Sequence, residues 1–122
     1  MGTYEFFSDE EIACQCGCGQ MAMDALFMRK VVDGRRALGF PFVVTSAYRC
    51  PEHNNNVSSS GYNGPHTLGR AIDIKASSRQ KFLIMDYFKG EGMTRFGVAN
   101  SFIHFDDLTE HDLFDEEVVW TY

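Results

Sequence analysis

The sequence has few basic residues and no long apolar run. Eleven Lys and Arg residues stand against seventeen Asp and Glu residues, which gives a formal net charge of −6. An acidic chain is repelled by phosphate backbones, so we expect no binding to nucleic acid. No stretch approaches the roughly 20 apolar residues that cross a bilayer. Residues 1–6 also lack the basic and apolar regions of a secretory signal. We therefore expect neither membrane association nor a signal peptide.

The length and composition limit the size of the fold. The chain has 122 residues, of which 44% are hydrophobic and 23% are charged. These proportions are those of ordinary globular proteins, and the length suits one compact domain. We therefore expect residues 1–122 to form a single domain. No sequence feature marks an oligomer interface, so the expected state is a monomer.

The four cysteines are unevenly spaced. Cys14, Cys16 and Cys18 alternate with other residues, and Cys50 stands alone. This spacing differs from the C-x2-C pairs that are usual in structural zinc sites. A disulfide framework is typical of secreted chains. Three states remain open, namely a disulfide or free thiols, a turn whose thiols only pack, and a second metal site.

Hydrophobic periodicity predicts two main helices. In residues 23–38 apolar side chains recur every three or four residues, and Gly39 follows as an expected end. A second helix is expected from residue 77 or 78 to residue 88. Ser8 and Glu11 have the spacing of a capping box, which predicts one short helical turn.

Short apolar segments between turn-forming residues predict the strands. They lie at residues 40–45, 70–74, 95–99, 101–105 and 118–122. Residues 50–65 are rich in turn formers, and a loop this long inside a compact domain is usually functional or disordered. Helices segregated from several short strands are typical of an α+β domain with a mostly antiparallel sheet.

Three side chains are unusual for their surroundings. Asp73 lies between two isoleucines, where an unpaired carboxylate is costly. His104 lies among large apolar residues, and His66 directly follows the long loop. Two imidazoles and one carboxylate are the ligand count of a catalytic zinc site, which keeps a fourth position open for water. The ordinary alternatives are hydrogen-bonded core histidines and an Asp73 that caps a turn or pairs with Arg70.

Four spaced features occur together around these residues. They are His66-x6-Asp73, the Gly69 and Ala71 inside it, the apolar strand of His104, and the upstream segment Ser46-Ala47-Tyr48-Arg49. The combination resembles the zinc D-alanyl-D-alanine carboxypeptidase family, which groups with the lysostaphin-type peptidases and the amino-terminal signalling domain of Hedgehog. The likeness is closest to small single-domain members from bacteria and bacteriophages. It covers most of the chain and implies the α+β fold of that group.

The resemblance implies one zinc ion bound by His66, Asp73 and His104. It also implies that Arg49 binds a carboxylate or carbonyl oxygen of the substrate, because a guanidinium is always charged and can bind a carboxylate in a bidentate manner. A surface ion pair is the alternative for this arginine. His53 lies just beyond it and is a further candidate for substrate binding.

The general base is the point at which the sequence departs from the family. Many relatives carry a glutamate three residues before the last zinc-binding histidine, or a histidine two residues before it. Ser101 and Phe102 occupy these positions. Asp106 is the expected substitute, because residues 104 and 106 of a strand share a face. It is expected to act as a catalytic base or to orient His104. Glu91 is a weaker candidate.

The implied function is zinc-dependent hydrolysis of a peptide bond in the peptidoglycan stem peptide, as a carboxypeptidase or an endopeptidase. The expected partner is therefore the stem peptide, reached after cell lysis or from a virion. One alternative is a catalytically inactive zinc-binding module, such as a structural or wall-recognition part of a phage particle, which the missing glutamate favours. Another is a metal-free α+β interaction domain.

Overall fold

Five strands form one sheet in the computed structural model, which describes residues 2–122. The sheet order is β1-β2-β4-β3-β5. The strands are β1 (Val43–Ser46), β2 (Ala71–Lys75), β3 (Arg95–Val98), β4 (Phe102–Asp106) and β5 (Val118–Thr121). Neighbouring strands pair antiparallel except β3 and β5, which are parallel. The prediction of an α+β domain with a mostly antiparallel sheet is confirmed.

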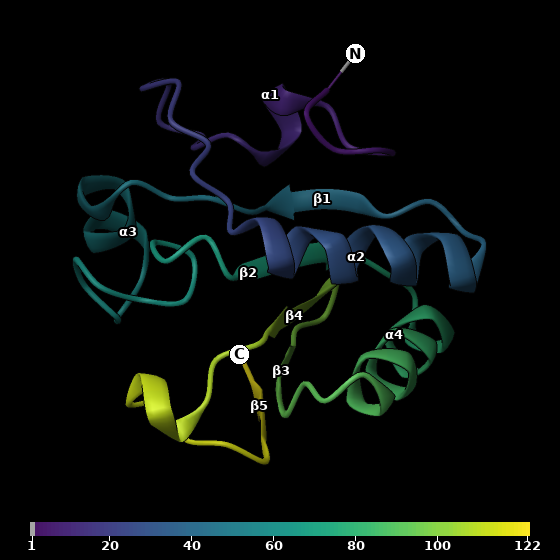
Figure 1. The fold of residues 1–122 in the computed structure, drawn as a ribbon. Coiled ribbons are helices and arrows are strands. Elements are labelled where there is room, and N and C mark those ends of the chain that lie inside the picture. Colours follow the sequence, from purple (N-terminus) through teal and green to yellow (C-terminus); the bar gives the residue numbers. More distant parts are fainter. Residues whose placement is uncertain (1) are drawn as a thin grey trace.

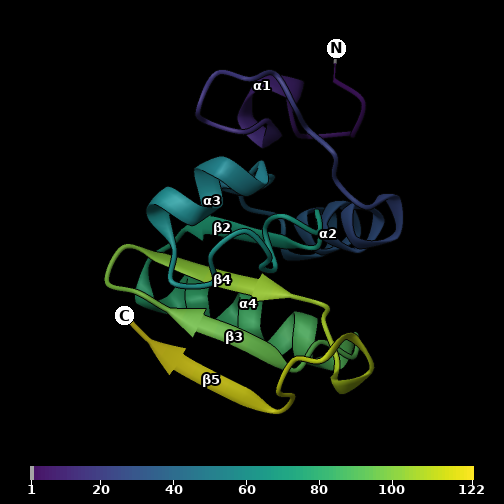
Figure 2. The same cartoon turned by 90° about the vertical axis from the view of Figure 1, so that its left-hand side faces the viewer.

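The helices lie on both faces of the sheet. They are α1 (Asp9–Ile12), α2 (Ala25–Leu38), α3 (Pro51–Val57), α4 (Ser78–Gly90) and the 3-10 turn η1 (Glu110–Asp112). The two long helices, α2 and α4, lie on one side, and α3 with the loop after it lies on the other (Figures 1 and 2). None of the described helices is long and apolar enough to cross a membrane.

Aromatic side chains form the core between the sheet and the long helices. The rings of Phe88 in α4 and Phe105 in β4 stack with their centroids 4.3 Å apart. Phe27 of α2 packs against the same Phe105 ring at 6.3 Å. Successive side chains of a strand point to opposite faces of the sheet. Because Phe105 points toward the helices, its neighbours His104 and Asp106 point to the other face.

Capping residues define the helix ends. The side chain of Asp24 accepts a hydrogen bond from the backbone N–H of Phe27, and Gly39 ends α2 with a φ of 78°. Ser8 and Glu11 form the expected capping box at α1. The polar first turns and the left-handed glycine satisfy backbone groups that a helix end leaves unpaired.

Two predictions about local structure were wrong. Residues 50–65 were expected to be a loop, but residues 51–57 form α3, which Pro51 begins and the buried Asn54 attaches to the fold. Proline suits the first turn of a helix because its φ is already close to the helical value. It also lacks an N–H group, and an N–H at this position would have no partner within the helix. The first strand begins at Val43 and not at residue 40.

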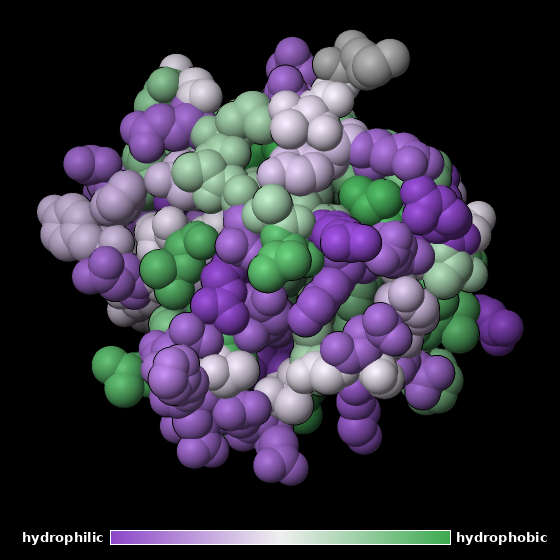
Figure 3. Space-filling view, in the orientation of Figure 1, coloured by the Kyte–Doolittle hydropathy of each residue, from purple (hydrophilic) through white to green (hydrophobic). Residues whose placement is uncertain are grey.

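The face of the molecule that Figure 3 shows carries apolar side chains scattered among polar ones.

Candidate metal centre

The three residues expected to bind zinc meet on the sheet face opposite α4. Asp73 in β2 is the direct cross-strand partner of His104 in β4. Such partners project side by side from the sheet. Asp73 Oδ1 lies 2.9 Å from His104 Nδ1 and 3.3 Å from Nε2 of His66, which the loop after α3 supplies. One ligand atom from each residue lies within 4.8 Å of the other two, and all three residues are buried.

The orientation of His66 follows from a backbone contact. Its Nδ1 lies 2.6 Å from the carbonyl oxygen of Ala47. A carbonyl oxygen only accepts, so Nδ1 carries the hydrogen and Nε2 presents its lone pair toward Asp73. The chain turns sharply after this histidine at Gly69, whose φ is 69° and where a Cβ would lie 2.1 Å from the carbonyl oxygen of Ala22. Only glycine fits that close approach.

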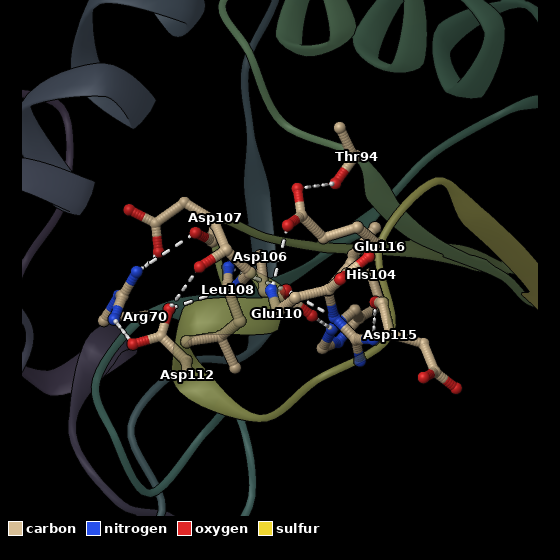
Figure 4. Close-up of polar contacts among 12 residues, drawn as sticks. Arg70, Thr94, His104, Asp106, Asp107, Leu108, Glu110, Asp112, Asp115 and Glu116 are labelled. Atoms are coloured by element: carbon tan, nitrogen blue, oxygen red, sulfur yellow. Dashed lines mark hydrogen bonds and ion pairs between the residues drawn. The ribbon is translucent and has the colours of Figure 1, made fainter.

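The orientation of His104 follows from Asp106. Asp106 Oδ2 lies 2.7 Å from Nε2 of His104, so Nε2–H donates to the carboxylate and Nδ1 is the nitrogen that faces Asp73. The other oxygen of Asp106 accepts from Arg95 Nε at 2.8 Å and from the backbone N–H of Leu108 at 3.2 Å. Figure 4 shows Asp106 between His104 and Leu108. The fully buried carboxylate is thus paired on both oxygens.

The donor set fits a cation. Two imidazole nitrogens and one carboxylate face one another in a buried position, and each can offer a lone pair to a metal ion. Burial lowers the pKa of His66. Burial alone would raise the pKa of Asp73, but its close contacts with His104 and His66 hold it well below its usual range. Burial alone would likewise lower the pKa of His104, but Asp106 and Asp73 raise it. Two nitrogens and one oxygen are a zinc ligand set that leaves one position open.

Arg49 lies beside this donor set. Its Nη2 is 3.8 Å from Asp73 Oδ2, and its side chain is 18% exposed. Ser46 Oγ accepts from Arg49 Nε at 3.1 Å, and Asn54 Oδ1 accepts from Nη1 at 3.2 Å. Asn54 is itself buried and donates to Ser60 Oγ and to the carbonyl oxygen of Gly61. The guanidinium is therefore held in place while part of it stays accessible.

A cleft of about 580 Å³ opens over the three donors. Its walls combine basic, hydroxyl and aromatic side chains. They include Arg49, Arg95, Ser58, Ser59, Ser60, Phe102, Phe114, Trp120 and Tyr122. A cleft of this size with a few convergent polar groups has the form of a ligand site.

A family model described as Peptidase M15 matches residues 5–106. The chain belongs to the peptidase M15 family. The match covers His66, Asp73 and His104, and it ends at Asp106, before the segment that carries Trp120. A comparison with curated proteins found no match. Peptidases of the M15 family are zinc-dependent metallopeptidases, and the donor set of this chain agrees with that chemistry.

The remaining sequence candidates lie apart from the M15 donor set. His53 is half-buried in α3 and does not line the cleft; Asn54, the next residue, points inward instead. Glu91 caps the end of α4, on the opposite face of the sheet, so it does not face the donors. Arg70 pairs with Asp107 and Asp112 (Figure 4) and not with Asp73.

Asp106 shares a strand face with His104, as its position two residues along predicts. Its carboxylate contacts the ring nitrogen that faces away from Asp73, and it is not part of the cleft wall. Of the two roles expected for it, this geometry favours orienting His104. Among the described residues of the wall, Asp73 is the only acidic one.

The aromatic wall of the M15 cleft was missed in the sequence. The Trp120 ring centroid lies 5.2 Å from that of His104. Trp120 is paired in register with Gly97, where a Cβ would lie 2.5 Å from the indole Nε1. A glycine inside a strand indicates that another group approaches the backbone closely. Gly97 was therefore a signal for this contact in the sequence, but it did not indicate that Trp120 is the approaching residue.

Proposed function

We propose that the protein hydrolyses a peptide bond in the stem peptide of peptidoglycan, next to a D-amino acid. The observation that carries the proposal is the convergence of His66, Asp73 and His104 beneath a cleft that Arg49 also enters. Stem peptides are rich in carboxylates, and the guanidinium of Arg49 offers them a charged donor. Membership of the M15 family supports the choice of a peptide as substrate. The wall is then reached after cell lysis or from a virion.

Each residue has a separate task in this scheme. His66, Asp73 and His104 hold zinc, which when bound supplies Lewis-acid activation of water and of the scissile carbonyl. The Ala47 carbonyl and the Asp106 carboxylate keep the two histidines in the required tautomers. These contacts leave the lone pairs that face Asp73 free to bind the metal.

Arg49 positions the substrate. Its contacts with Ser46 and Asn54 hold one side of the guanidinium, so the remaining N–H groups can bind a carboxylate or carbonyl oxygen of the stem peptide. Replacement by lysine keeps the positive charge but removes the planar guanidinium, which can donate two parallel hydrogen bonds to one carboxylate. We expect Arg49→Lys to raise KM while leaving zinc content unchanged.

A second function has an observation in its favour. The described cleft wall holds no carboxylate besides Asp73, and a hydrolase of this kind usually has a carboxylate that accepts a proton. A zinc-bound module that recognises wall peptides without cleaving them needs no such group.

Turnover separates the two functions. Zinc-loaded protein is incubated with purified muropeptides, and products are followed by mass spectrometry, beside His66→Ala and the matched control His111→Ala. His111 is an exposed histidine outside both metal-ligand groups. Hydrolysis by the native and His111→Ala proteins alone supports the peptidase. Binding of muropeptides without product supports the recognition module, and neither binding nor product overturns both.

A further inference from the structure

The four cysteines meet at one point although the sequence separates them. Cys14, Cys16 and Cys18 lie on the turn after α1, and Cys50 directly precedes α3. Their four sulfur atoms lie within 4.8 Å of one another. The Sγ atoms of Cys14 and Cys16 are 3.4 Å apart, and those of Cys16 and Cys50 are 3.7 Å apart. This group is separate from the His66 donor set.

These spacings match a shared metal better than a disulfide. Sulfur atoms at the corners of a tetrahedron around zinc, with Zn–S bonds of about 2.3 Å, lie about 3.8 Å apart. A disulfide instead joins two sulfurs at about 2.05 Å, well below the separations of 3.4 Å and 3.7 Å between these sulfur atoms. Simple packing does not account for the group either. Cys16 and Cys18 are exposed, yet their sulfur atoms lie close to those of the two buried cysteines.

The backbone around the cysteines is shaped for this convergence. The N–H of Cys14 donates to the carbonyl oxygen of Gln20 at 2.8 Å and closes the turn. Gly17 and Gly19 have φ values of 89° and 80°, in the left-handed region that glycine adopts without the usual steric cost. The N–H of Cys50 donates to Cys14 Sγ at 3.3 Å. Backbone donors to sulfur offset the charge that builds up when thiolates surround one ion.

We propose that Cys14, Cys16, Cys18 and Cys50 bind a second zinc ion in a closed, structural site. Four thiolates leave no open position, so this ion takes no part in hydrolysis. It joins the segment before α2 to the start of α3. Cys50 follows Arg49 directly, and α3 supplies the Asn54 that holds Arg49. The site therefore fixes the segment that carries the cleft arginine, and it does not depend on the proposed peptidase activity.

The test is the zinc content of reduced protein, measured by elemental analysis. The native chain is expected to hold two zinc ions, Cys16→Ser/Cys18→Ser one, and His66→Ala one. Both replaced cysteines are exposed, so the core is preserved. Gln20→Ser, in the same turn, is the matched control and is expected to keep both ions.

Cobalt substitution identifies the ligands. Thiolate-to-cobalt charge transfer is expected in the native and His66→Ala proteins and is expected to be lost in the double cysteine variant. Cys18→His is expected to retain the metal, because three cysteines and one histidine also form a structural zinc site. This replacement keeps the test valid if the serine variant fails to fold.

Three results overturn the second site. One is an unchanged zinc content in the double cysteine variant beside a native chain with one ion. Another is the absence of thiolate-to-cobalt charge transfer in folded native protein. The last is an intact mass lower by two hydrogen atoms per bond in protein prepared under reducing conditions, which indicates disulfides. Failure of the His66 site alone removes one ion and leaves the thiolate spectrum, so the two hypotheses fail distinguishably.

Discussion

Asp106 Oδ2 lies 2.7 Å from Nε2 of His104, on the edge of the imidazole that faces away from Asp73. The opposite edge of the ring presents Nδ1 to Asp73 at 2.9 Å. The carboxylate is therefore placed to act on a metal bound here through the histidine, since it would fix the tautomer and increase the basicity of the nitrogen that faces the other donors.

Removing this negative charge is expected to weaken zinc binding. Asp106→Asn keeps the size of the side chain but loses the charge, so zinc affinity at the His66 site should fall about 10- to 100-fold. Competition with a chromophoric chelator measures the affinity. Asp107→Asn is the control, because its carboxylate pairs with Arg70 and not with His104. Equal losses in the two variants would show that the negative charge of the protein as a whole, and not the contact with His104, sets the zinc affinity.

Zinc binding is expected to change the fluorescence of Trp120. The chain contains one tryptophan, and its ring lies 5.2 Å from that of His104. A charged ion on the histidine alters the environment of the indole. Titration of zinc into metal-free protein should therefore shift the tryptophan emission until the His66 site is full. The shift should vanish in His66→Ala and persist in His111→Ala; a shift that persists in His66→Ala contradicts the assignment.

Asn54→Ala is expected to destabilise the protein by about 1–3 kcal/mol, because it leaves buried polar groups without partners. The amide is buried and contacts Arg49, Ser60 and Gly61. Urea unfolding of this variant beside Asn56→Ala, an exposed asparagine of the same helix, measures the difference. Equal stability of the two variants would mean that these hydrogen bonds do not hold the loop.

Gly34→Ala is expected to cost about 1–3 kcal/mol of stability through overpacking. An added Cβ would lie 2.3 Å from the ring of Phe88, in the core between α2 and α4. Gly90→Ala is the control, because its Cβ meets nothing within 4 Å. Helix propensity predicts that the control gains up to about 1 kcal/mol. Thermal unfolding monitored by circular dichroism compares both variants with the native chain.

The long helices and most strands were predictable because their signals are local. The apolar period before Gly39, the cap at Asp24 and the paired apolar segments of β3 and β4 each lie within a short stretch of chain. The short helix α3 was missed because its attachment is not local. Asn54 contacts residues on both sides of it, and turn-forming residues surround it.

The sequence by itself indicated which side chains are candidates to bind a metal. A carboxylate between two isoleucines and a histidine in an apolar strand are costly unless they bind something, so Asp73 and His104 stood out from their neighbours alone. His66 joined them through its spacing to Asp73. Membership of the M15 family, which the spaced motifs predicted, is confirmed.

Only the tertiary structure decided how those side chains are oriented and what surrounds them. The Ala47 carbonyl sets the tautomer of His66 from 19 residues away, and Trp120 covers His104 from another strand. The gathering of Cys50 with Cys14 across 36 residues is of the same kind. Such contacts depend on strand order and loop path, which arise from the packing of the whole sheet, whereas a local pattern specifies only which residues share a face.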